Sequence, residues 1–165
     1  RRANKEDECT GHFWEGRFKS QALLDESALL ACMAYVDLNP IRAGLAKSLN
    51  DSEFTSIKER IEETTTDLLG FGHGENNLPY YLTSYIDLVD QTGRVIRDEE
   101  HGHIHQKMSS VLSDLNLNPD TWLDELKGFK SFGFSAVGTV YQLQKYAQET
   151  GKNWSVGLRL QPAFE

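Results

Sequence analysis

A tyrosine and an asparagine, four residues apart, are the side chains whose types and spacing most clearly suggest chemistry. Tyr35 and Asn39 lie one turn apart on a predicted helix and would project from one face of it. Arg17 and Lys19 alternate on one face of a predicted strand, and Arg42 follows the tyrosine helix closely. Guanidinium and ammonium groups in such a set can grip the phosphates of a single-stranded backbone. The pattern therefore favours a phosphate-binding site around Tyr35.

These residues also have structural interpretations. Tyr35 would then be a half-buried helix aromatic, and Asn39 a helix C-cap before Pro40. The three cations would be ordinary surface charges. Asp37 lies on another helix face, where it would face solvent or pair with Arg42.

The elements that must position Tyr35 are a strand and a helix. Aromatic and polar residues alternate around Gly16, which predicts a bent strand or hairpin arm over 12–24. Its aromatic residues (Phe13, Trp14 and Phe18) would stack on bases or, more simply, pack in a core. A helix is predicted over 26–38, with Asp25 as its N-cap and Pro40 ending it. Its apolar stripe would consist of Leu29, Cys32, Met33 and Val36.

The remainder of the chain is predicted to be helical. A helix over 51–63 has Thr55 or Ser52 as its candidate N-cap, and a Gly- and Pro-rich stretch at 70–78 predicts a domain boundary. We therefore expect two parts, residues 1–70 and 71–165. The second part is predicted to be an all-helical module with helices over 80–97, 105–117, 118–129 and 135–151.

Composition places the chain among ordinary globular proteins. Of 165 residues, 39% are hydrophobic and 25% are charged, which excludes wholesale disorder. No apolar run is long enough to predict a membrane span, and two cysteines make no disulfide framework, so a cytoplasmic protein is expected. The net charge of −8 argues against an indiscriminate nucleic-acid coat. Residues 1–60 are nearly neutral, with nine basic and ten acidic side chains, so a local basic face fits only there.

Two histidine motifs offer weaker signals for metal binding. His103 and His105 are two apart and would face the same way on a strand, but they lie between predicted helices beside acidic residues. This setting favours a polar loop. Cys9 and His12 could start a zinc site, but no partner pair follows at a useful spacing.

The stretch from Trp14 to Pro40 resembles the nucleophile region of the single-tyrosine HUH transposases, in particular the REP-associated tyrosine transposases of bacterial mobile elements. The shared pattern is an aromatic-x-x-Arg-Phe strand, formed here by Trp14, Arg17 and Phe18, followed by a tyrosine helix and Asn-Pro. The resemblance is strong over about residues 10–46 and weaker beyond. It implies an α+β parent fold, with a ferredoxin-like HUH sheet and the tyrosine on a covering helix. This chain would be mostly α-helical, with one or two residual strands.

The resemblance also implies a role for each site residue. Tyr35 would be the nucleophile that nicks and rejoins single-stranded DNA through a covalent 5′-phosphotyrosine link. Asn39 would be an oxygen ligand of a divalent metal, Mg or Mn, and Arg17, Lys19 and Arg42 would contact DNA. Free phenols ionise near pH 10, so such a nucleophile needs help, which a metal on the phosphate can provide.

The sequence departs from the family at its histidine pair. The 34 residues before Tyr35 contain one histidine, His12, so the His-hydrophobic-His pair of the family is absent from them. The expectation is a C-terminal portion of a transposase, inactive and without bound metal on its own. Its partners would be single-stranded or hairpin DNA and, by analogy, a second copy of the chain in a homodimer. The alternative is a non-catalytic DNA-binding or interaction module, or a decayed remnant.

Overall fold

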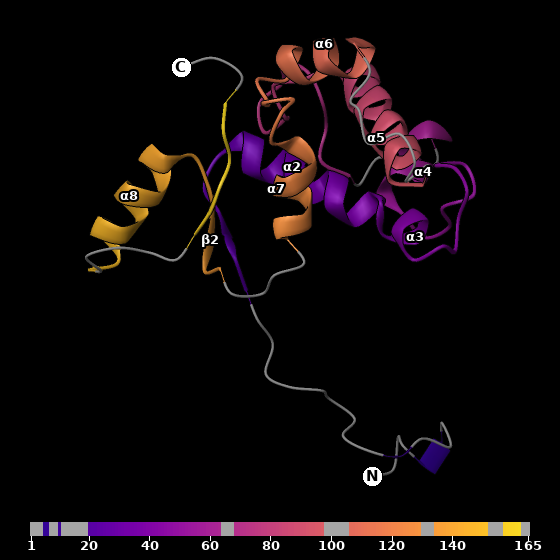
Figure 1. Cartoon of the computed structure of the whole chain (residues 1–165), viewed down its shortest axis with the longest axis horizontal. Helices are drawn as coiled ribbons and strands as arrows, with labels where there is room; N and C mark the ends of the chain where they lie inside the picture. Colours follow the sequence, from indigo (N-terminus) through magenta and orange to yellow (C-terminus); the bar gives the residue numbers. More distant parts are fainter. Residues whose placement is uncertain are drawn as a thin grey trace.

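The computed structural model describes residues 5–6, 10, 20–63, 68–97, 106–129, 134–151 and 157–162. These residues form helices and a small parallel sheet, consistent with an α+β description (Figure 1). In chain order the elements are β1 (Ala22–Leu23), α2 (Glu26–Asp37), α3 (Asn39–Arg42), α4 (Ser56–Ile61), α5 (Leu82–Arg97), α6 (Gln106–Asp114), α7 (Trp122–Gly128), β2 (Ala136–Gly138), α8 (Val140–Glu149) and β3 (Gly157–Arg159). In the described part of the chain, no helix has the length and apolar character needed to cross a membrane.

The sheet joins the two ends of the chain. Its strands are parallel in the order β1-β2-β3, with Ala22 opposite Ala136 and Val137 opposite Leu158. Helix α8 lies on one side of the strands, and α2 and α7 lie on the other (Figure 1). The expectation of an all-helical second half is therefore wrong, because β2 and β3 both belong to it. Each of these strands has only three residues, too few to show an alternating pattern.

Helix α2 carries Tyr35 and begins where the sequence predicts. The Oδ1 atom of Asp25 accepts a hydrogen bond from the Ala28 N–H at 2.8 Å, so Asp25 is the N-cap. The predicted apolar stripe is only partly right, because Cys32 and Met33 are half-buried against the core but do not form its centre. The buried side is formed by Ala28, Leu30, Ala31, Ala34 and Asp37, whereas Val36 is 52% exposed. Because the helix is apolar on almost every side, periodicity could not identify the face that packs inward.

Asp25 also connects this helix to the sheet. Its Oδ2 atom accepts the Thr139 N–H at 3.0 Å, where β2 ends and α8 begins. One carboxylate therefore caps α2 and fixes a segment more than a hundred residues away in sequence.

We predict that Asp25→Ala lowers the free energy of unfolding by about 2–4 kcal/mol, because both the helix cap and the Thr139 N–H lose their acceptor. Asp25→Ser provides the matched comparison. A serine hydroxyl can cap α2 but is too short to reach Thr139, so about half of the loss should remain. Urea unfolding of the two variants measures the difference, and equal stability of both would contradict a double role for Asp25.

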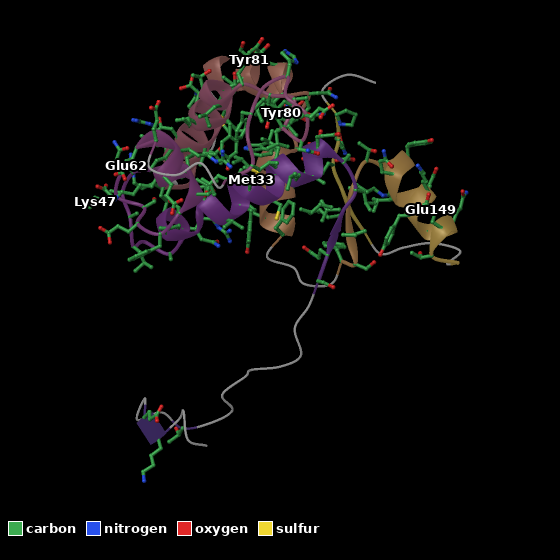
Figure 2. The ribbon with its side chains drawn as sticks, turned by 180° about the vertical axis from the view of Figure 1, so that it is seen from behind. Met33, Lys47, Glu62, Tyr80, Tyr81 and Glu149 are labelled. Carbon is green, nitrogen blue, oxygen red and sulfur yellow. The ribbon has the colours of Figure 1, made fainter. Side chains whose placement is uncertain are left out.

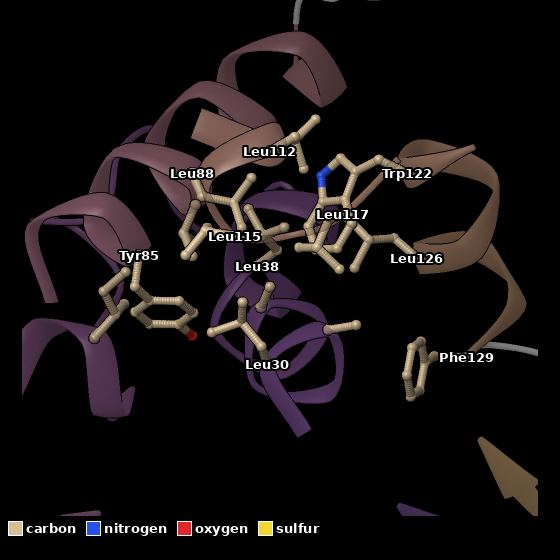
Figure 3. Close-up of a cluster of buried hydrophobic side chains, with 14 of the residues drawn as sticks. Leu30, Leu38, Tyr85, Leu88, Leu112, Leu115, Leu117, Trp122, Leu126 and Phe129 are labelled. Atoms are coloured by element: carbon tan, nitrogen blue, oxygen red, sulfur yellow. The ribbon is translucent and has the colours of Figure 1, made fainter. Parts of the chain in front are cut away.

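The hydrophobic core is continuous across the helices (Figure 3). Trp122, Tyr85 and Leu30 are fully buried in it, and the Trp122 Nε1–H donates to Thr92 Oγ1 at 3.0 Å. Side chains from both sides of the stretch at 70–78 share this core, and Phe71 forms a β-bridge with Leu78 within that stretch. Charged side chains such as Lys47, Glu62 and Glu149 project at the outside of the molecule (Figure 2).

Candidate functional site

Tyr35 lies in the last turn of α2, half-buried between an aromatic ring and a cation. Its ring packs against that of Phe129, at the end of α7, with 5.6 Å between centroids. The guanidinium carbon of Arg42 lies 4.3 Å from the centroid of the Tyr35 ring. This is within cation–π range, so Arg42 and the Tyr35 ring hold each other in place.

Asn39 joins the pair through Arg42. The Arg42 Nη1–H donates to Asn39 Oδ1 at 3.3 Å. The structure therefore brings together three of the residues singled out in the sequence, Tyr35, Asn39 and Arg42. Arg17 and Lys19, together with Trp14 and Phe18 of the motif and the histidines His12, His103 and His105, lie outside the described residues.

The backbone between Tyr35 and Arg42 differs from the sequence expectation. Helix α2 ends at Asp37, but Leu38 keeps helical angles (φ −82°, ψ −8°) and α3 starts at Asn39. Pro40 sits in the first turn of α3, where a missing N–H breaks no helical hydrogen bond. The interpretation of Asn39 as the C-cap is therefore wrong, because Leu38 is the C-cap of α2, whereas α2 ends before Pro40 as predicted. Because the chain continues from α2 into α3 with helical angles, the Arg42 side chain lies over the Tyr35 ring.

A chamber opens beside Tyr35, between the α2–α3 segment, α5 and α7. Its volume is about 480 Å³. Five aliphatic side chains and three polar-ended ones line it: Leu38, Val95, Ile96, Leu123, Leu126, Tyr35, Arg42 and Lys127. We call it the Tyr35 chamber. Its volume is within the usual range of small-molecule sites.

Asp37 is the residue of this region that sequence reasoning placed wrongly. It is fully buried and accepts hydrogen bonds from the hydroxyls of Tyr85 (2.5 Å) and Ser56 (2.9 Å) and from the Ile57 N–H (3.2 Å). It neither faces solvent nor pairs with Arg42. Its carboxylate instead caps α4 from another helix, while the Thr55 hydroxyl at the N-cap position of α4 donates to Ser52 O.

The buried surroundings of Asp37 act on its partner Tyr85. Burial, and then the negative charge of Asp37, raise the pKa of the Tyr85 hydroxyl. Tyr85 therefore stays a hydrogen-bond donor and holds the end of α2 against α5. No local sequence signal marks this pair, because its members lie 48 residues apart.

Gly93 allows α3 to lie close to α5. A Cβ atom at this position would come within 3.0 Å of Ile41 Cδ1 and 3.3 Å of Leu38 Cδ2. An added Cβ would force the Ile41 and Leu38 side chains to shift by a few tenths of an ångström. Gly93 is thus a second positioning residue that the sequence analysis missed.

The described residues do not make a metal site at Asn39. Within those ranges, no group of three or more His, Cys, Asp or Glu side chains gathers. The Asn39 side-chain oxygen accepts a hydrogen bond from the Arg42 guanidinium, which is a cation. Asn39 is therefore a single neutral oxygen ligand that lies beside a positive charge. The metal role of Asn39 stays a prediction.

Glu125, on α7 near the chamber, is a buried carboxylate with one satisfied oxygen. Its Oε1 atom accepts the Thr121 hydroxyl and the Gln161 N–H, both at 2.8 Å. Its Oε2 atom is buried and has no hydrogen-bond partner among the described residues. Burial raises the pKa of Glu125, and the two hydrogen bonds partly offset the rise.

We expect Glu125 to make stability depend on pH. The pKa of Glu125 in the folded chain lies above the unfolded value near 4.5. The stabilisation that Glu125 contributes to the fold is therefore complete below pH 4.5 and is lost as the pH rises through the folded pKa. The native chain should therefore lose stability relative to Glu125→Gln on going from about pH 4 to pH 7. Urea unfolding across this range measures the effect, with the exposed Glu149→Gln as control. A constant difference between native and Glu125→Gln proteins would refute it.

Comparisons with models of known protein families, with curated proteins and with solved structures find no match to this chain.

Proposed function

We propose that this chain is the tyrosine-bearing part of an enzyme that cuts and rejoins single-stranded DNA, with Tyr35 as the nucleophile. The observation that carries the proposal is the placement of the Arg42 guanidinium 4.3 Å above the Tyr35 ring. The Trp14-to-Pro40 motif, which resembles the single-tyrosine HUH transposases, supports it independently of that geometry.

The proposed step is a transesterification at a phosphodiester. The Tyr35 oxygen attacks phosphorus, a Tyr35 Oη–P bond forms, and the bond from phosphorus to the 3′ oxygen breaks. The leaving 3′ oxygen takes up a proton in place of the one that Tyr35 loses. Attack by a 3′ hydroxyl on the phosphotyrosine reverses the step and rejoins a strand.

Arg42 would bind the phosphate during this step. Its planar guanidinium can donate two parallel hydrogen bonds to phosphoryl oxygens, and its positive charge stabilises the charge that develops there. Packing against Tyr35 limits its rotamers, so less entropy is lost when the phosphate binds. The donor–acceptor contact with Asn39 at 3.3 Å is long enough to be exchanged for a charged ligand.

The proposal predicts a covalent adduct that depends on one hydroxyl. A labelled single-stranded hairpin library with Mn²⁺ is incubated with the chain alone, and with the chain mixed with a separate segment that supplies a His-hydrophobic-His pair. Denaturing gels should show a DNA-linked band in the second case, and Tyr35→Phe should abolish it.

Tyr81→Phe is the matched control, because Tyr81 is 67% exposed and lies outside the Tyr35 chamber. An adduct that survives Tyr35→Phe, or no adduct in either preparation of the folded chain, would contradict the proposal. The latter result, combined with DNA binding, would favour the non-catalytic binding module or a decayed remnant.

A further inference from the structure

The Tyr35 chamber has walls and charges that fit a ligand of a particular chemistry. Its walls are aliphatic, and the charged groups among its described lining residues are both cations, Arg42 and Lys127. These two cations come from different helices, α3 and α7, in a chain whose net charge is −8. An apolar chamber with two cations selects a molecule with an apolar body and an anionic end.

Lys127 is available for exchange with a ligand. It forms an ion pair with Asp124 at 3.0 Å, but the two side chains are 76% and 81% exposed. Exposed pairs of this kind are weak because water and salt screen them. A ligand carboxylate can therefore replace Asp124 at little cost.

The walls favour a hydrocarbon over a nucleobase. Reading a base requires amide or carboxylate groups for its edges or an open aromatic face for stacking. The described lining has no such amide or carboxylate, and its ring, Tyr35, already contacts Phe129 and Arg42. Leucine, isoleucine and valine surfaces instead match a flexible alkyl chain.

We propose that the Tyr35 chamber binds a medium-chain carboxylate, with the alkyl chain among Leu38, Ile96 and Leu123 and the carboxylate on Arg42 and Lys127. This site shares Arg42 with the proposed DNA chemistry but does not depend on Tyr35 being a nucleophile. Occupancy of the chamber would compete for Arg42, so a bound carboxylate would oppose phosphate binding at the same guanidinium.

Calorimetric titration of the whole chain with hexanoate, octanoate and decanoate, each below its micellar concentration, tests the proposal. Affinity should rise about fourfold for each added CH₂ until the chamber is full. Decanol and decyltrimethylammonium, which share the chain but not the charge, should bind at least tenfold more weakly than decanoate.

Variants locate the binding. Lys127→Gln should weaken decanoate about fivefold and leave decanol unchanged, whereas Asp124→Asn should tighten decanoate by freeing Lys127. Ile96→Trp should fill the chamber and abolish binding while the thermal midpoint is retained. Tyr81→Phe, at an exposed tyrosine outside the chamber, should keep decanoate binding within about twofold.

Several results would overturn the proposal. These are no binding of any carboxylate, equal binding of decanol and decanoate, and full binding by a folded Ile96→Trp protein. Preferential binding of thymidine monophosphate over decanoate would assign the chamber to a nucleotide instead. None of these results would alter the outcome of the adduct assay on Tyr35.

Discussion

Asp37→Ala is expected to lower the free energy of unfolding by about 3–5 kcal/mol. The substitution leaves the Tyr85 hydroxyl, the Ser56 hydroxyl and the Ile57 N–H without their acceptor in the interior. It also removes the cap of α4, since Thr55 does not provide one. The loss is large for a single substitution because one carboxylate satisfies three donors.

Two further variants separate the roles of the Asp37 oxygens. Asp37→Asn keeps one acceptor oxygen but presents an NH₂ group to a donor, so we expect about 2 kcal/mol of destabilisation. The double-mutant cycle of Asp37→Ala with Tyr85→Phe should show a coupling of about 1–3 kcal/mol, measured by urea unfolding. The exposed Glu62→Gln serves as control, within about 0.5 kcal/mol of the native chain. A loss below about 1 kcal/mol for Asp37→Ala would contradict the network.

Arg42→Gln is expected to slow formation of the Tyr35–DNA adduct by about 10²–10³-fold. The reason is the loss of the charge that stabilises the phosphoryl group in the transition state, together with the planar donor pair that orients it. Arg42→Lys keeps the charge without the fork and should fall between Arg42→Gln and the native chain. Initial rates from denaturing gels at saturating DNA measure the effect.

A cation elsewhere on the surface provides the control for Arg42. Lys47 is exposed and lies outside the Tyr35 chamber, so Lys47→Gln should change the adduct rate less than about twofold. Thermal unfolding of each variant establishes that it is folded. Equal rate losses for Lys47→Gln and Arg42→Gln would indicate general electrostatic attraction, not a phosphate contact by Arg42.

Local signals in the sequence predicted α2 well, and they failed where distant partners decide the structure. The N-cap at Asp25 and the helix over 26–38 depend on neighbouring residues, and α2 occupies 26–37. The buried position of Asp37 depends on Ser56 and Tyr85, which follow 19 and 48 residues later. A carboxylate at a helix end is normally solvated, so nothing local marked it as buried.

The sheet illustrates the same limit. Residues 135–139 precede a strongly helical stretch and were predicted to continue it, but Ala136–Gly138 form β2 between β1 and β3. The partners of β2 lie at the other end of the chain and after α8, so its pairing could not be read locally. Thr139 was predicted within the helix, whereas it is the N-cap of α8.

The candidate site was only partly predictable. Helical spacing predicted that Tyr35 and Asn39 lie close together, but not that Arg42 connects them. The stacked position of Arg42 requires Leu38 to keep helical angles and Pro40 to sit in the first turn of α3. The chamber could not be predicted, since its walls come from three separate parts of the chain, the α2–α3 segment, α5 and α7.

Mass spectrometry of the DNA-linked chain tests the central claim most directly. The adduct formed with a short oligonucleotide is digested with nuclease and protease, and the modified peptide is sequenced to find the residue that carries the nucleotide. We predict a 5′-phosphonucleotide on Tyr35 and unmodified Tyr81 in the same sample. A nucleotide on any other residue, or none on Tyr35 in a preparation that has cleaved DNA, would contradict the assignment of Tyr35 as the nucleophile.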